Sequence, residues 1–69
     1  MHEDMMYEVY VNAGATGSEY AEAINWLIDG GLHETAAKYL TRMPSDHPYW
    51  EDIVDEIGEA TLLMIGVDI

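Results

Sequence analysis

The sequence predicts a small α+β domain with the order β-α-α-α-β, in which three helices pack on a two-stranded antiparallel sheet of the terminal segments. Three observations lead to this prediction. Residues 5–12 alternate between apolar and mixed side chains, residues 17–57 carry apolar side chains at helical spacing, and residues 61–69 alternate again. A chain of 69 residues has room for a single domain, residues 1–69, with a thin core.

The two expected strands are the ends of the chain. The first is expected over Met5–Asn12, where every second residue is apolar: Tyr7, Val9 and Val11. Glycines within residues 13–17 then favour a turn. The second strand is expected over Thr61–Ile69, because the first strand needs a partner and this segment is the only candidate within the chain. In the alternative, the third helix continues through Gly58 to about Ile65.

The first helix is expected over residues 17–29. Thr16 and Glu19 have the spacing of a capping box, and the two glycines at 30–31 end the helix. One face is apolar at the spacing i, i+3, i+4, i+7 and i+8, and it is expected to be buried. Its residues are Tyr20, Ala23, Ile24, Leu27 and Ile28.

Two further helices are expected in the centre of the chain. The second spans about residues 32–43 and stops at Pro44, and the third begins near Asp46 as its cap and ends at Gly58. Their apolar faces are expected to complete the core. These faces comprise Leu32, Ala36, Tyr39, Leu40 and Met43 in the second helix, and Trp50, Ile53, Val54 and Ile57 in the third.

Charge is the strongest feature of the composition. Fourteen acidic residues face two basic ones, Lys38 and Arg42, for a formal net charge of −12. Residues 1–31 and 45–69 contain acids without a single base. Such a field repels nucleic acids and anionic membranes and attracts basic surfaces. We therefore expect a basic protein as the partner, with no direct contact to nucleic acid and none to a membrane.

Composition also bounds the class of protein. Hydrophobic residues make up 49% of the chain and fall at regular spacings, which favours a folded domain over disorder. The absence of cysteine excludes disulfides and thiolate metal sites. Residues 1–4 lack a signal-peptide pattern, and no apolar stretch approaches the roughly 20 residues that a membrane helix needs. The expected location is cytoplasmic.

The third helix carries a predicted ridge of five acids: Glu51, Asp52, Asp55, Glu56 and Glu59. At 100° per residue they lie about 100° to 240° from Trp50, and they span about 12 Å. That is about one charge every 2–3 Å, between the phosphate spacing of a DNA duplex and that of a single strand. Like charges at i,i+4 destabilise a helix by about 0.2–0.5 kcal/mol per pair. We interpret the ridge as a binding surface; the alternative is a solvated face that keeps a small protein soluble.

Two aromatic residues are candidate anchors for a partner. Trp26 lies away from the main apolar face of the first helix, and Glu19 and Glu22 flank it. Tyr49 lies at the edge of the third helix beside the acids. An exposed tryptophan with a polar rim is typical of an interface hot spot. In the alternative, Trp26 packs against the sheet or against the turn that follows its helix.

No residue pattern indicates catalysis, a metal or a cofactor. The turn at residues 14–18 precedes a helix, as phosphate-binding loops do, but it matches no phosphate-binding motif. Asp52 and Glu56 lack the ordered oxygen spacing of a calcium loop. Three histidines lack metal-ligand spacing and are expected at the surface: His2, His33 and His47. The protein is therefore not expected to be an enzyme.

The chain resembles, as a class, the small acidic inhibitors that phages and other mobile elements encode, such as anti-CRISPR proteins that imitate nucleic acid. The resemblance rests on length, the net charge of −12, the acids at 51–59 and the lack of catalytic motifs. It implies a non-enzymatic inhibitor that covers the basic, nucleic-acid-binding surface of a bacterial defence complex. Two alternatives are an acidic interaction module or adaptor, monomeric or homodimeric, that binds through apolar surface, and a protein adapted to high salt.

Overall fold

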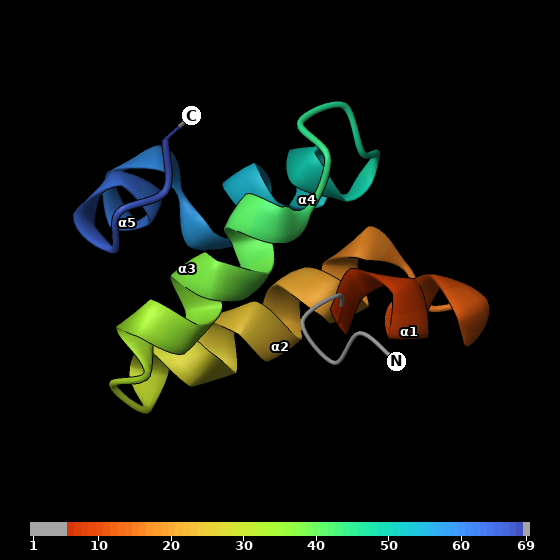
Figure 1. Ribbon diagram of the computed structural model, residues 1–69, viewed down its shortest axis with the longest axis horizontal. Helices are drawn as coiled ribbons and strands as arrows, with labels where there is room; N and C mark the ends of the chain where they lie inside the picture. Colours follow the sequence, from red (N-terminus) through yellow and green to blue (C-terminus); the bar gives the residue numbers. More distant parts are fainter. Residues whose placement is uncertain (1–5, 69) are drawn as a thin grey trace.

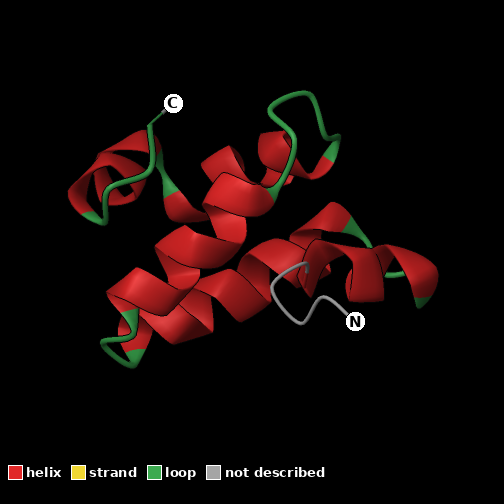
Figure 2. Cartoon of the chain, viewed as in Figure 1, coloured by secondary structure: helices red, strands yellow, loops and turns green. Residues whose placement is uncertain are grey.

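Helices make up all the regular structure in residues 6–68, the part of the chain that the computed structural model describes. The five helices are α1 (Met6–Asn12), α2 (Gly17–Asp29), α3 (His33–Arg42), α4 (Tyr49–Ile57) and α5 (Glu59–Met64) (Figure 1). Figure 2 shows helices and loops but no strand among these residues. The predicted β-α-α-α-β fold is therefore wrong at both strands, and the described chain is all-α. Met5 and Ile69, at the outer ends of the predicted strands, lie outside the described residues.

The first predicted strand is helix α1. Its exposed residues include Val9 and Val11, which the strand prediction had placed on the apolar face. The residues of α1 that pack against the core instead follow helical spacing: Met6, Tyr7 and Tyr10. β-branched and aromatic residues favour strands when a pleated neighbour packs against them. No such neighbour exists in the described chain, and the rings of Tyr7 and Tyr10 contact His47 and Tyr20 of other segments.

The second predicted strand is not a strand either: its first part, residues 61–64, belongs to helix α5, and residues 65–68 form a turn and a loop. Leu62 is fully buried in α5, whereas its neighbours Leu63 and Met64 are exposed. The alternative prediction, one helix continuing to about residue 65, is wrong because the helix is interrupted at Gly58. Gly58 has φ +91° and ψ 146°, a conformation that glycine adopts without steric cost, so α4 stops there and α5 begins at the next residue.

Helix α2 is the scaffold on which α3 and α4 pack, and α5 packs against α4. It begins with the predicted capping box: the Glu19 N–H donates to Thr16 Oγ1 at 3.2 Å, and the Thr16 N–H donates to Glu19 Oε1 at 2.8 Å. Its most extensive packing is against α4, and α3 lies beside it as the second arm of a hairpin (Figure 1). The buried core comprises Tyr20, Ala21, Ile24, Ile28, Ala36, Leu40, Met43, Tyr49, Ile53, Leu62 and Val67.

Helix α4 buries a different face from the predicted one. Ile53 is fully buried and Tyr49 is 8% exposed, whereas Trp50, Val54 and Ile57 are only partly buried. The buried stripe is therefore rotated toward Tyr49, since the packing against α2 decides which side of α4 faces the core. As a result, the predicted core residue Trp50 lies at the edge of the core, and the predicted surface residue Tyr49 lies inside it.

The start of α4 also differs from the prediction. The helix begins at Tyr49, three residues after the expected cap Asp46, which is exposed. The Tyr49 N–H instead donates to Nδ1 of His47 at 3.2 Å. An imidazole nitrogen thus satisfies one of the amide groups that the first turn of a helix leaves without a partner. His47, expected at the surface, is partly buried in this position.

Helices α1, α2 and α5 end in the same motif. In each case a glycine with positive φ follows the helix, and the next N–H donates to the carbonyl five residues earlier. The three hydrogen bonds are Ala15 to Tyr10 at 2.9 Å, Leu32 to Leu27 at 2.8 Å and Val67 to Leu62 at 2.9 Å. This is the Schellman arrangement, which closes a helix with a left-handed glycine.

Candidate functional site

The exposed acids of α4 are fewer than the sequence predicted. Glu51 and Asp55 each lie two residues from the fully buried Ile53, so they lie about 160° around the helix from it and point away from the core. Glu56 is also exposed. These three acids, which we call the α4 acid face, span five residue steps or about 7.5 Å of helix axis. The predicted ridge of five charges over about 12 Å is therefore too long.

Asp52 does not belong to the exposed face. It is partly buried, and its carboxylate lies against Gly17, the first residue of α2. A Cβ at residue 17 would contact Asp52 Oδ2 directly and would lie 3.0 Å from Asp52 Cγ. The N-terminus of a helix carries a partial positive charge, which favours a carboxylate at this place. Asp52 therefore contributes to the packing of α4 on α2.

Glu59 is separated from the other predicted ridge residues by the break at Gly58. It is exposed and is the first residue of α5. Because the positive φ of Gly58 ends α4, the 100° rule that placed Glu59 in line with Glu51 and Asp55 does not extend across it. The Glu59 carboxylate therefore lies on α5 and is not part of the α4 acid face.

A second acidic surface lies on α2 around Trp26. Trp26 is 71% exposed, and it lies two residues from both Ile24 and Ile28, so it is about 160° from each of these buried residues. Glu22, four residues before it, and Asp29, three residues after it, are its neighbours along the same face and are exposed. The alternative in which Trp26 packs against the chain is therefore wrong. We call Glu22, Trp26 and Asp29 the α2 crest.

Tyr49 is unavailable as a surface anchor because its side chain is part of the core. Its hydroxyl donates a hydrogen bond to the Ala15 carbonyl at 2.7 Å, which ties α4 to the turn between α1 and α2. Its ring contacts two others, with centroid distances of 5.3 Å to Tyr20 and 4.7 Å to His47. Edge-on and tilted contacts at these distances stabilise the packing of aromatic rings. Tyr49 thus has a structural position that sequence reasoning missed.

Tyr20 lies at the centre of this aromatic cluster. It is 0% exposed, and its hydroxyl has no hydrogen-bond partner. Burial raises the pKa of Tyr20 above its ordinary value because the phenolate would lose its hydration there, and the surrounding tyrosines, Tyr10 first, add to this effect. The group is held neutral and is enclosed by protein, so it has no access to a substrate.

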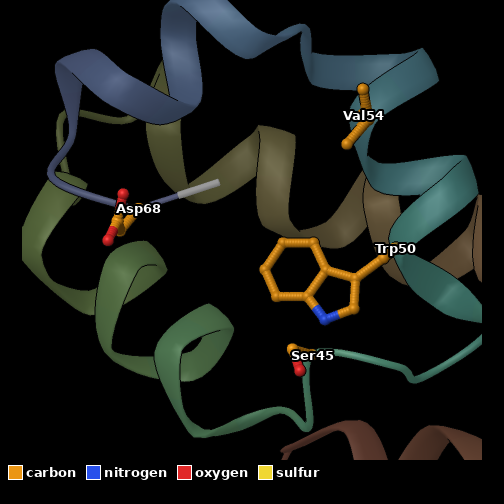
Figure 3. Close-up of a pocket in the computed structure, with 4 residues that line it drawn as sticks. All are labelled: Ser45, Trp50, Val54 and Asp68. Carbon is orange, nitrogen blue, oxygen red and sulfur yellow. The ribbon is translucent and has the colours of Figure 1, made fainter.

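A surface hollow beside Trp50 was not indicated by the sequence. It has a volume of about 350 Å³ and is lined by four residues from α4, the loop before it and the C-terminal segment: Ser45, Trp50, Val54 and Asp68 (Figure 3). The Trp50 Nε1–H donates to the Pro44 carbonyl at 2.7 Å, which holds the indole in place. An adjoining depression shares Trp50 and Val54 and reaches Glu51 and Asp55. Sequence reasoning missed the hollow because its walls come from segments far apart in the chain.

The described residues carry no sign of metal chemistry. Among them, no group of three or more His, Asp or Glu side chains is placed to hold a metal ion. His33 is exposed on α3, and His47 accepts the hydrogen bond from Tyr49; His2 lies outside the described residues. None of the helices in residues 6–68 is long and apolar enough to cross a membrane.

Together, the α4 acid face, the α2 crest and the Trp50 hollow offer carboxylates next to exposed aromatic surface. Such groups attract and hold cations. Comparison of the chain with protein-family models, with curated proteins and with solved structures found no match.

Proposed function

We propose that this protein is a non-enzymatic acidic inhibitor that covers the basic, nucleic-acid-binding surface of a bacterial defence complex in the host cytoplasm. One observation carries the proposal. At a net charge of −12, the exposed acids include Glu51, Asp55 and Glu56 on α4 and Glu22 and Asp29 on α2. Because these like charges repel one another, they gain most when a basic surface neutralises them.

The expected mode of binding is electrostatic. Complementary charge raises the association rate and selects a basic partner, while apolar contacts lower the dissociation rate. On the α2 crest, Trp26 supplies such a contact beside Glu22 and Asp29. The inhibitor would compete with DNA or RNA because both ligands need the same lysines and arginines of the target.

The proposal is tested by capture from a bacterial lysate. Tagged protein is used as bait, bound proteins are eluted with a salt gradient, and the capture is repeated with added DNA and RNA. We expect a nucleic-acid-binding complex that both salt and nucleic acid release. The double variant Glu51→Lys/Asp55→Lys should lose this capture while its far-UV circular dichroism stays helical, since both side chains are exposed.

A matched control separates a defined surface from net charge alone. The variant Glu8→Lys/Glu34→Lys changes the net charge by the same amount at exposed positions on α1 and α3. It is expected to retain the captured complex. If both variants lose the complex equally, or if nucleic acid fails to compete, the proposed surface or the proposed mimicry is wrong.

A second candidate function is favoured by Trp26. An interaction module or adaptor that binds its partner through apolar surface uses residues such as Trp26, which is 71% exposed. In that case the captured partner should resist high salt, and Trp26→Ala should abolish capture while Glu51→Lys/Asp55→Lys leaves it intact. Sedimentation would show whether that partner is a second copy of this chain.

A further inference from the structure

The Trp50 hollow combines apolar walls with a rim that carries negative charge. Trp50 and Val54 form its apolar part, and Figure 3 shows Asp68 across the hollow from Trp50, with Ser45 at the loop. Glu51 and Asp55 line an adjoining depression that shares Trp50 and Val54 with the hollow. A group that enters next to Trp50 therefore lies near the carboxylate of the hollow, Asp68, and near those of the depression, Glu51 and Asp55.

The groups that the hollow offers exclude most classes of ligand. Among residues 6–68, those that line the hollow and the depression include three acids and no base, so the charges there repel an anion. The Trp50 Nε1–H is engaged by the Pro44 carbonyl at 2.7 Å, so the indole has no free donor for a ligand oxygen. A cationic group at the end of an apolar side chain fits the apolar wall and the negative charge of the hollow. Its methylene groups cover the wall, and its charged end is attracted to the indole ring and to the carboxylates.

Arginine is the side chain that meets these conditions best. Its planar guanidinium stacks on aromatic rings and donates to carboxylates in pairs, whereas the compact ammonium of lysine is more strongly hydrated. A volume of about 350 Å³ is at the lower end of the range for ligand sites, which suits one side chain rather than a larger ligand.

We propose that the Trp50 hollow binds an arginine side chain of a protein partner. The identity of that partner as a nucleic-acid-binding protein rests on the proposed function, but the chemistry of the hollow does not. The arginine enters between Trp50 and Asp68, with its stem on Val54 and its guanidinium toward the carboxylates. A partner's arginine of this kind would be an anchor of the interface.

The test uses the two tryptophans of the chain as internal reporters. In a ¹⁵N–¹H correlation spectrum, the indole N–H groups of Trp26 and Trp50 give one signal each, and only that of Trp50 lies at the hollow. The full chain is titrated at low salt with an acetylated, amidated tri-arginine peptide, and with tri-lysine and tri-citrulline peptides. We expect a saturable shift of the Trp50 signal with arginine, a shift that saturates at higher concentration with lysine and none with the uncharged citrulline.

Two charge-matched variants complete the experiment. Glu51→Gln/Asp55→Asn/Asp68→Asn removes the carboxylates of the hollow and of the adjoining depression, and Glu8→Gln/Glu22→Gln/Asp29→Asn removes three exposed carboxylates elsewhere. The first is expected to weaken arginine binding at Trp50 about tenfold, as the loss of about 1.4 kcal/mol would do, and the second to weaken it much less.

The proposal is overturned if the Trp50 signal does not move, if citrulline moves it as arginine does, or if both variants weaken binding alike. Equal affinity for lysine and arginine would overturn the assignment to a guanidinium. These outcomes are independent of the lysate capture: the hollow can bind the arginine peptide even if no nucleic-acid-binding complex is captured, and the reverse also holds.

Discussion

Replacement of Tyr20 by phenylalanine is expected to stabilise the protein, which is unusual for a fully buried residue. The Tyr20 hydroxyl is enclosed at 0% exposure and has no hydrogen-bond partner. An unpaired buried polar group costs about 1–3 kcal/mol relative to its hydrated state in the unfolded chain. Tyr20→Phe removes this cost and keeps the ring, so the ring contacts with Tyr10 and Tyr49 remain.

A small loss of packing reduces this gain in the free energy of unfolding. Removal of one oxygen leaves a void of about 15 Å³, which at about 24 cal/mol per Å³ costs about 0.4 kcal/mol. The net gain is therefore about 0.6–2.6 kcal/mol. Tyr49→Phe is the matched control, because Tyr49 is also buried but donates to the Ala15 carbonyl at 2.7 Å. Loss of that hydrogen bond is expected to destabilise the protein by about 1 kcal/mol.

Urea unfolding followed by circular dichroism measures both changes. In a domain of this size, 1 kcal/mol corresponds to about 4–8 °C in Tm, so thermal melts give an independent check. The two variants should move in opposite directions. If Tyr20→Phe is destabilising by as much as Tyr49→Phe, the Tyr20 hydroxyl has a partner, such as a buried water, and the reasoning fails.

Three further outcomes are expected. Gly17→Ala should destabilise the protein by about 1–3 kcal/mol in urea unfolding, because the new Cβ meets Asp52 and lies 3.1 Å from Tyr49 Cδ1; a gain in stability would contradict the close approach. Stability should fall as pH rises above about 10, the ordinary tyrosine pKa: burial raises the folded-state pKa of Tyr20, so its contribution is complete below that pH and is lost above it as the unfolded state ionises. Tyr20→Phe should show a smaller alkaline loss than the wild type, and an equal loss would refute this cause. Trp26→Ala should change the free energy of unfolding by less than about 0.5 kcal/mol, since the side chain is 71% exposed; a larger loss would mean that Trp26 packs on the fold.

The structure changes which substitutions test the proposed function. Charge reversal at Asp52 is a poor test, because this carboxylate lies against the start of α2 and its loss would disturb the packing of α4. Substitution of Tyr49 would likewise remove a core residue. Glu51 and Asp55 are exposed on the far side of α4 and can be reversed without removing a core contact.

Local sequence alone determined the centre of the fold. The limits of α2 and its capping box were predicted from Thr16, Glu19 and the glycines at 30–31, because these interactions join residues three to five positions apart. The end of α3 before Pro44 and of α4 at Gly58 follow from the same local rules. The strongly acidic composition, and the exposed acids Glu51 and Asp55, were likewise evident from the chain.

Only the tertiary structure decided the conformation of the two terminal segments and which residues form the site. Segments of seven and six residues, such as α1 and α5, are too short for local propensity to choose their conformation, so packing on α2 and α4 decides it. The rotation of α4 depends on the same packing, and it buries Tyr49, half-buries Asp52 and leaves Trp50 beside a hollow. Periodicity shows that a helix has a buried side, but the neighbouring helices determine where that side is centred.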